Sequence, residues 1–245
     1  MFLENRFMNY VGIDGCSKGW VAVSVDEEDE IKMKLFELES IRNIIESFGQ
    51  GYYLIDIPVG LPDSQKTIRL CDIEARRLLG FPRSSSIFNP PTWEILEIEN
   101  YKEANLKYFN ITGKGLQKQS FFIKNKVKSV NFFLRDNLEY RGILKEFHPE
   151  LSFYFLNGEK PLIYSKRTLE GRNERIKILA VYLNGIKEGL ENIFFSMNKR
   201  EVKEDDIIDA CCGAILARLA KGRYKKIPAE IEVDRYGLKM EINYF

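Results

Sequence analysis

Hydrophobic and polar positions alternate most clearly near the start of the chain. Ile31, Met33 and Leu35 alternate with polar residues, as expected of a strand with one buried face. Two more apolar segments of similar length precede it, so we expect three strands, at residues 10–15, 20–25 and 31–38. Because the segments that join them are short, at residues 16–19 and 26–30, the three strands are predicted to form an antiparallel meander.

The next segments favour a mixed α/β sheet. A helix is expected at residues 40–48, followed by a strand at residues 53–57. A strand reached through a helical crossover is usually parallel to the strand before the helix, so the fourth strand should lie beside the first. The ends of these two strands then form the edge where ligands commonly bind in α/β sheets.

Residues 60–144 interrupt this pattern and are predicted to form a mainly helical insertion, with helices at residues 69–79, 101–109 and 117–134. The last helix has an apolar face, which could form a substrate lid or a homodimer surface; it consists of Ile123, Val127, Val130 and Leu134. A short strand at residues 144–147 should return to the sheet. Helices at residues 173–188 and 204–220 and a short extended tail complete a single domain over residues 1–245.

Two aspartates stand where these strands should be apolar. Asp14 lies in the first strand, and Asp56 lies in the fourth. A buried, ionised carboxylate costs several kcal/mol unless it is paired, and a divalent cation could compensate both. The alternatives are that Asp14 forms a turn before Gly15 and that Asp56 is a strand-end residue before Pro58.

A third acidic element lies at residues 204–210. On a helix, Asp206 and Asp209 lie on one face, because they are three residues apart. Acidic residues also favour the first turn of a helix through its macrodipole, which explains Glu204 and Asp205. Asp209 is explained less well in this way, because small apolar residues follow it at 210–214 and should bring it close to the sheet.

The chain resembles a family of predicted ribonuclease H-like nucleases, domain of unknown function 429, along nearly its whole length. The motifs are GIDGCSKGW (12–20), IDIPVGLP (55–62), CDIEARRLLG (71–80), TGKGLQKQ (112–119), EFHPELSF (146–153), SKRT (165–168) and DDIIDA (205–210). The resemblance implies a ribonuclease H-like mixed sheet in the order 3-2-1-4-5, with strand 2 antiparallel, flanked by helices.

The resemblance also implies a metal-dependent nuclease that hydrolyses phosphodiester bonds. In that superfamily, carboxylates hold two Mg²⁺ or Mn²⁺ ions, which activate water and stabilise the leaving oxygen. Here Asp14 would bridge the ions, and Asp56, Asp206 and Asp209 would complete the site. Glu146 could be a further catalytic ligand, and His148 a proton carrier; alternatively, Pro149 ends the strand and His148 is a buried structural residue.

Several basic residues are candidates for binding the nucleic acid. Residues 113–130 contain five lysines and no acid, with Phe121 and Phe122 among them, a combination that suits single strands but also a solvated helix face. Polar loops near Arg83 and Lys166 could contact phosphate or be ordinary loops. The candidate substrate-binding residues are Lys18, Arg83, Lys114, Lys118 and Lys166.

Composition narrows the remaining choices. The net charge of +1 indicates no particular partner. Residues 1–9 are not typical of a signal peptide, no apolar run reaches membrane-spanning length, and the four cysteines are scattered. We therefore expect a soluble, cytoplasmic protein without a structural zinc site or a disulfide framework.

Two other functions fit parts of the sequence. Residues 15–19, with Ser17 and Lys18, also resemble the phosphate-binding hairpin of actin-like ATPases and sugar kinases, although no second phosphate loop is evident. A binding module that keeps the fold and recognises nucleic acid or protein without catalysis is the other alternative. Metal-dependent turnover would separate the nuclease from both.

Overall fold

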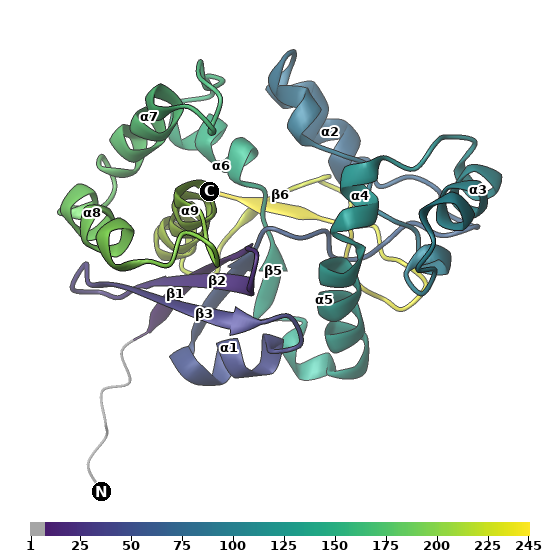
Figure 1. Ribbon diagram of the computed structural model, residues 1–245, viewed down its shortest axis with the longest axis horizontal. Coiled ribbons are helices and arrows are strands. Elements are labelled where there is room, and N and C mark those ends of the chain that lie inside the picture. The colour runs from purple at the N-terminus through teal and green to yellow at the C-terminus, as the bar shows by residue number, and fades with distance from the viewer. Residues whose placement is uncertain (1–7) are drawn as a thin grey trace, which may run out of the picture.

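The computed structural model describes residues 8–245, and its centre is a five-stranded mixed sheet (Figure 1). The strands are β1 (Asn9–Gly15), β2 (Gly19–Val25), β3 (Ile31–Glu37), β4 (Gly51–Ile55) and β5 (Leu144–Glu146). Their order is β3-β2-β1-β4-β5; β2 is antiparallel to β1 and β3, whereas β4 is parallel to β1 and β5. This confirms the predicted strand order and the direction of strand 2.

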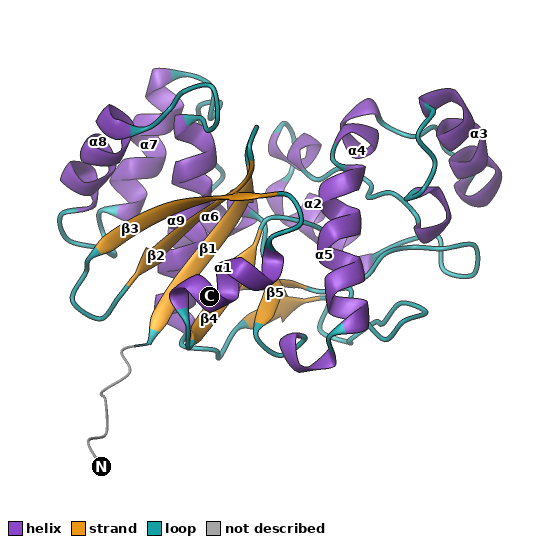
Figure 2. Cartoon of the chain, turned by 60° about the horizontal axis from the view of Figure 1, so that its bottom comes forward, coloured by secondary structure: helices purple, strands orange, loops and turns teal. Residues whose placement is uncertain are grey.

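Helices cover both faces of the sheet, which explains why β1 and β2 are almost entirely buried (Figure 2). On one face, Val11, Ile13 and Ile55 pack with α1 (Ile41–Phe48) and α5 (Lys124–Asp136). The opposite face is covered mainly by four helices: α6 (Pro149–Leu156), α7 (Leu169–Leu179), α8 (Ile186–Ser196) and α9 (Glu204–Ala220). Because each fully buried aliphatic side chain contributes about 2 kcal/mol, these two cores stabilise the sheet from both sides.

Helix α9 lies directly against β1 because two glycines face each other. A Cβ atom placed on Gly12 would lie 1.9 Å from the carbonyl oxygen of Ala210, and one on Gly213 would lie 3.0 Å from the Cα of Gly12. Any larger side chain at Gly12 would therefore collide with the backbone of α9. The small residues after Asp209 do bring this helix close to the sheet, as the sequence predicts.

The segment between β4 and β5 is mainly helical, as expected. It contains α2 (Leu70–Leu79), α3 (Tyr101–Thr112), α4 (Lys118–Phe122), α5 and three 3₁₀ helices: Arg83–Ser86, Trp93–Ile95 and Leu138–Tyr140. The continuous helix expected at residues 117–134 is wrong, because Ile123 ends α4 before α5 begins. Val127, Val130 and Leu134 are buried in the core of their own chain, so their face is not exposed as a lid or a dimer surface.

Two other helix predictions need correction. The single helix expected at residues 173–188 is divided into α7 and α8, because the chain turns before Gly185, which has φ +70°. Pro149 begins α6 instead of only ending the strand, since proline lacks the N–H that the first turn of a helix leaves unpaired. The tail forms a small antiparallel pair, β6 (Lys225–Ile227) and β7 (Ile242–Tyr244).

The described part of the chain has no helix that is long and apolar enough to cross a membrane. Its four cysteines are buried and unpaired. The interpretation of residues 1–9 as unlike a signal peptide falls mostly outside the described residues.

Candidate functional site: a carboxylate pocket at the strand ends

Alternation along the strands directs Asp14 and Asp56 to the same face of the sheet. In β1, Val11 and Ile13 point to the α1 and α5 core, so Asp14 points to the opposite side, which α9 covers. The amide of Asp56 donates to the carbonyl of Ile13 at 2.9 Å, which continues the parallel pairing of β4 with β1. The two aspartates thus lie at neighbouring carboxyl ends.

The first turns of α9 contribute two more carboxylates at the same edge. Asp206 accepts a hydrogen bond from the backbone amide of Lys203 at 3.1 Å. Asp209 is only 1% exposed, because it lies on the face of α9 that packs on the sheet. The positive end of the helix macrodipole favours negative charge in these turns.

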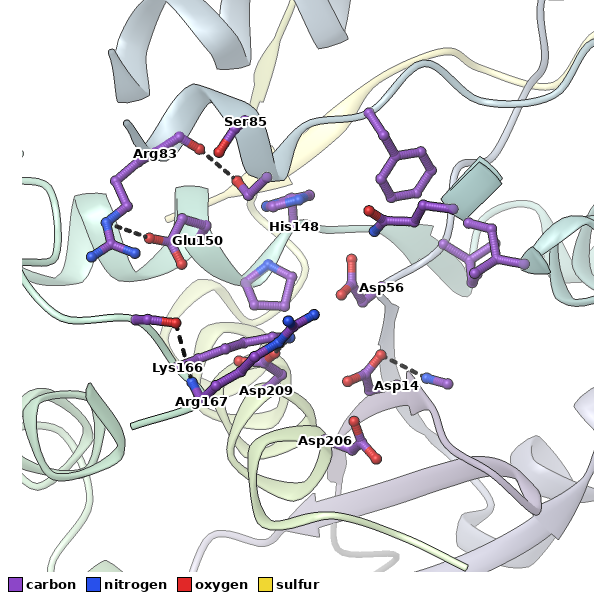
Figure 3. A pocket seen from close by; sticks show the side chains of 18 of the residues that line it. Asp14, Asp56, Arg83, Ser85, His148, Glu150, Lys166, Arg167, Asp206 and Asp209 are labelled. Carbon is purple, nitrogen blue, oxygen red and sulfur yellow. Dashed lines mark hydrogen bonds and ion pairs between the residues drawn. The ribbon is translucent and has the colours of Figure 1, made fainter. Parts of the chain in front are cut away.

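The four carboxylates line one pocket of about 470 Å³. Figure 3 shows Asp56, Asp14 and Asp206 one after another along one side of the pocket, with Lys166 and Arg167 across from Asp14. The remaining walls come from the segment after β5, from the loop before α7 and from the insertion, and they include Arg83, Phe88, Lys126, His148, Glu150 and Arg175. The structure therefore brings together the four aspartates that the sequence indicated, and with them Arg83 and Lys166.

Burial, together with mutual repulsion, keeps these carboxylates from ionising easily. Burial and the neighbouring Asp56 raise the pKa of Asp14 well above its usual range, and burial and Asp209 raise the pKa of Asp56 to about 7. Burial also raises the pKa of Asp206 to about 6. The four aspartates thus oppose one another's ionisation, although the pocket lining also contains five cationic side chains: Arg83, Lys126, Lys166, Arg167 and Arg175.

Lys166 is the cation that approaches this cluster most closely. Its Nζ lies 2.5 Å from Oδ2 of Asp209. Burial disfavours the ammonium, but Asp209 and Asp14 outweigh that effect and raise the pKa of Lys166 above its ordinary value. One lysine therefore partly balances four aspartates.

The donor set suits a hard divalent cation, because Mg²⁺ and Mn²⁺ prefer carboxylate oxygens. Among residues 8–245, no three histidine, cysteine or acidic side chains are arranged as ligands of one metal ion. Asp209 is engaged by Lys166, so it would have to exchange the ammonium for the ion. The chemistry of the aspartates fits such an ion, and Lys166 holds one of the ligands that it would need.

Glu146 does not belong to this pocket. Its Oε2 accepts a hydrogen bond from the amide of Val59 at 2.6 Å and is paired with the buried guanidinium of Arg69. Arg69 also contacts Asp72 at 3.2 Å. The carboxylate of Glu146 thus anchors α2 and the segment after β4, and the structure does not bring it to the four aspartates as the sequence suggested.

Arg175 and Glu150 line the pocket but were not selected from the sequence as site residues. Arg175 is 1% exposed, and its Nη2 lies 2.7 Å from Oε2 of Glu150. Arg83 approaches the other oxygen of Glu150 at 3.4 Å and donates to the carbonyls of Leu162 and Ile163 at 2.8 and 2.6 Å. Glu150 lies within the EFHPELSF motif, but only the fold shows that its partners come from α7 and the insertion.

His148 lies on the same wall as Glu150. Its Nδ1 has no hydrogen-bond partner in the described structure, and burial lowers its pKa. The imidazole therefore favours the neutral form, which can accept a proton.

Most of the candidate lysines lie elsewhere. Lys18 is near Glu37 and Glu201, at 3.9 and 4.0 Å, and does not line the pocket. Lys114 lines a different hollow, and Lys118 is exposed. From the lysine-rich segment, Lys126 is the one that reaches the pocket.

A family model described as "Protein of unknown function (DUF429)" matches residues 12–233. Searches of curated proteins and of solved structures found no match. The match covers most of the chain, and the chain belongs to the DUF429 family.

Proposed function

We propose that this DUF429 protein is a metal-dependent nuclease with a ribonuclease H-like fold, and that it hydrolyses phosphodiester bonds of nucleic acid. One observation carries the proposal: four aspartates from β1, the end of β4 and α9 line a single pocket and are only partly neutralised by Lys166. Asp14 and Asp209 are buried, and a buried, ionised carboxylate is costly unless it is paired with a cation. The mixed sheet order supports the choice of fold.

Asp14, Asp56, Asp206 and Asp209 would hold Mg²⁺ or Mn²⁺ in this pocket. When bound, these ions would activate water and stabilise the charge on the leaving oxygen. Asp14 lies between Asp56 and Asp206 in Figure 3, so it would be a central ligand of the site. Its burial, with 7% exposure, excludes most water from around it.

The basic residues around the pocket would orient the substrate. Lys126 and Lys166 line the pocket together with Arg167, and their positive charges suit a phosphate group. His148, with its free Nδ1 on the same wall, could accept a proton as the reaction proceeds.

The test is metal-dependent cleavage of labelled single-stranded, duplex and branched DNA and RNA. Asp14→Asn and Asp209→Asn should each lower Mn²⁺-dependent cleavage by roughly 1,000-fold or more, because each removes a charged ligand at the reacting centre. Asp136→Asn is the control, because Asp136 is an exposed aspartate of α5 that does not line the pocket. Full activity in both site variants, with or without a chelator, would contradict the proposal.

A further inference from the structure

A second hollow of about 470 Å³ lies beside the carboxylate pocket. It is formed by the start of α7 and the segment that leads into α9, and its lining includes Arg167, Arg172, Lys199, Lys203, Glu204 and Asp205. Arg167 lines both cavities, and Asp205 of the hollow is followed directly by Asp206 of the pocket. The two cavities therefore meet at Arg167.

The lining of the second hollow is predominantly basic, with four cationic side chains and two carboxylates. Glu204 already pairs with Arg172 at 3.2 Å and with Lys199 at 3.8 Å. Arg167 and Lys203 are exposed and form no ion pair within residues 8–245. These two side chains remain available to a ligand, and their charge suits an anion.

The depth of the carboxylate pocket limits which anionic polymer can reach both cavities. Asp14 and Asp209 are 7% and 1% exposed, so a reacting phosphate must enter the recess to approach them. A duplex is stiff over its persistence length of about 150 base pairs, whereas a single strand bends freely at each nucleotide. A single strand can thus place one phosphate in the recess and its next phosphates outside it.

We infer that the second hollow binds the phosphate backbone of single-stranded nucleic acid that extends from the carboxylate pocket past Arg167. The inference rests on the proposed function, because it takes the pocket to be the place where the strand reacts. Arg167 holds the strand where the two cavities meet, and Lys203 holds it farther along.

The test is the binding of a fluorescein-labelled single-stranded 12-mer, measured by anisotropy in EDTA over a range of salt concentrations. The variant is Arg167→Ala with Lys203→Ala, and the control is Lys107→Ala with Lys187→Ala, which removes two exposed lysines from α3 and α8. The double variant should bind about ten-fold more weakly, and its slope of log K against log salt should be shallower by about 1.4, because two phosphate contacts are lost. The control should bind like the unmodified protein, and a duplex of the same sequence should bind at least about ten-fold more weakly than the single strand.

An unchanged salt slope in the double variant would overturn the inference, and so would equal affinity for strand and duplex. Incubation of the unmodified protein with the same strand and Mn²⁺ tests the proposed function separately. A strand that binds through Arg167 and Lys203 but is not cut would leave the inference standing and contradict the nuclease. If the unmodified protein cuts the strand but the double variant binds it normally, the nuclease proposal stands and the inference about the second hollow is wrong.

Discussion

Acidic side chains gather at two neighbouring strand ends: Glu146 at the end of β5, and the four aspartates of the pocket near the ends of β1 and β4. The two groups differ in the charge of the side chains that act on them most strongly. Burial raises the pKa of Glu146, and the guanidinium of Arg69 opposes that rise. Burial also raises the pKa of Asp14, but there the strongest charge effect is repulsion from Asp56, which adds to the rise, and Lys166 opposes it less. Burial is common to both clusters, whereas repulsion between carboxylates as the strongest charge effect distinguishes the pocket.

The comparison separates a structural use of buried carboxylates from a functional one. Glu146 is satisfied by Arg69 and by the amide of Val59, so no further ligand is required. The four aspartates of the pocket share Lys166 as their nearest cation. A buried carboxylate with a complete set of partners stabilises the fold, and one that lacks them is a candidate for binding or catalysis.

The largest expected effect on stability concerns Glu146 and its partner Arg69. Glu146→Ala should lower the free energy of unfolding by about 3–5 kcal/mol, because it leaves the buried charge of Arg69 with Asp72 alone. Urea denaturation measures this change. Glu97→Ala is the control, because Glu97 forms an exposed pair with Lys128, and it should cost less than about 1 kcal/mol. A loss for Glu146→Ala as small as that of the control would remove the distinction between the clusters.

Neutralising a carboxylate of the pocket should instead raise the free energy of unfolding. The pKa of Asp56 rises from its ordinary 3.8 to about 7 in the folded protein, so the folded state binds more protons between these pH values and stability falls as pH rises through them. A rise in pKa of about 3 corresponds to about 4 kcal/mol, and because Asp56 is partly exposed we expect about half of it. Asp56→Asn should therefore stabilise the metal-free protein by about 2 kcal/mol at pH 8 and have little effect at pH 4. Thermal and urea unfolding in EDTA at both pH values measure this difference, and destabilisation at pH 8 would contradict it.

The smallest of the three effects concerns the competition between Lys166 and a metal ion. Lys166→Met should raise the affinity for Mn²⁺ about ten-fold, or about 1.4 kcal/mol, because Asp209 is then free of its ammonium partner. Calorimetric titration with Mn²⁺ measures the affinity without any substrate. Lys126→Met removes another lysine of the same pocket, one without an ion pair to the aspartates in the described residues, and should change the affinity less. Weaker Mn²⁺ binding by Lys166→Met would show that Lys166 assists the site.

Much of the sheet and of the carboxylate pocket could be predicted from the sequence, because both follow from local patterns. Alternation along the strands indicates their faces, and an acid in an otherwise apolar strand reveals Asp14 and Asp56. The spacing of Asp206 and Asp209 needs only the helical period. These features are contained in short segments, so no knowledge of distant contacts is required.

The partners of buried charges could not be predicted in the same way. Arg69 lies 77 positions before Glu146, and Arg175 lies 25 positions after Glu150, with no pattern that links them. Without these contacts, Glu146 looks as suitable for the site as Asp56. The same limitation applies to Lys114 and Lys118, because their distance from the aspartates depends on how the insertion folds.

The close contact between Gly12 and α9 has a consequence for ion size. Asp14 is two residues from Gly12, and Asp209 is one residue before the Ala210 carbonyl that Gly12 faces. The backbones that carry these two aspartates are thus in contact. Rotation of the side chains cannot change that backbone spacing. Mg²⁺ requires short and nearly octahedral contacts, whereas Ca²⁺ accepts longer and more variable ones. We therefore expect the proposed metal site to bind Mg²⁺ in preference to Ca²⁺.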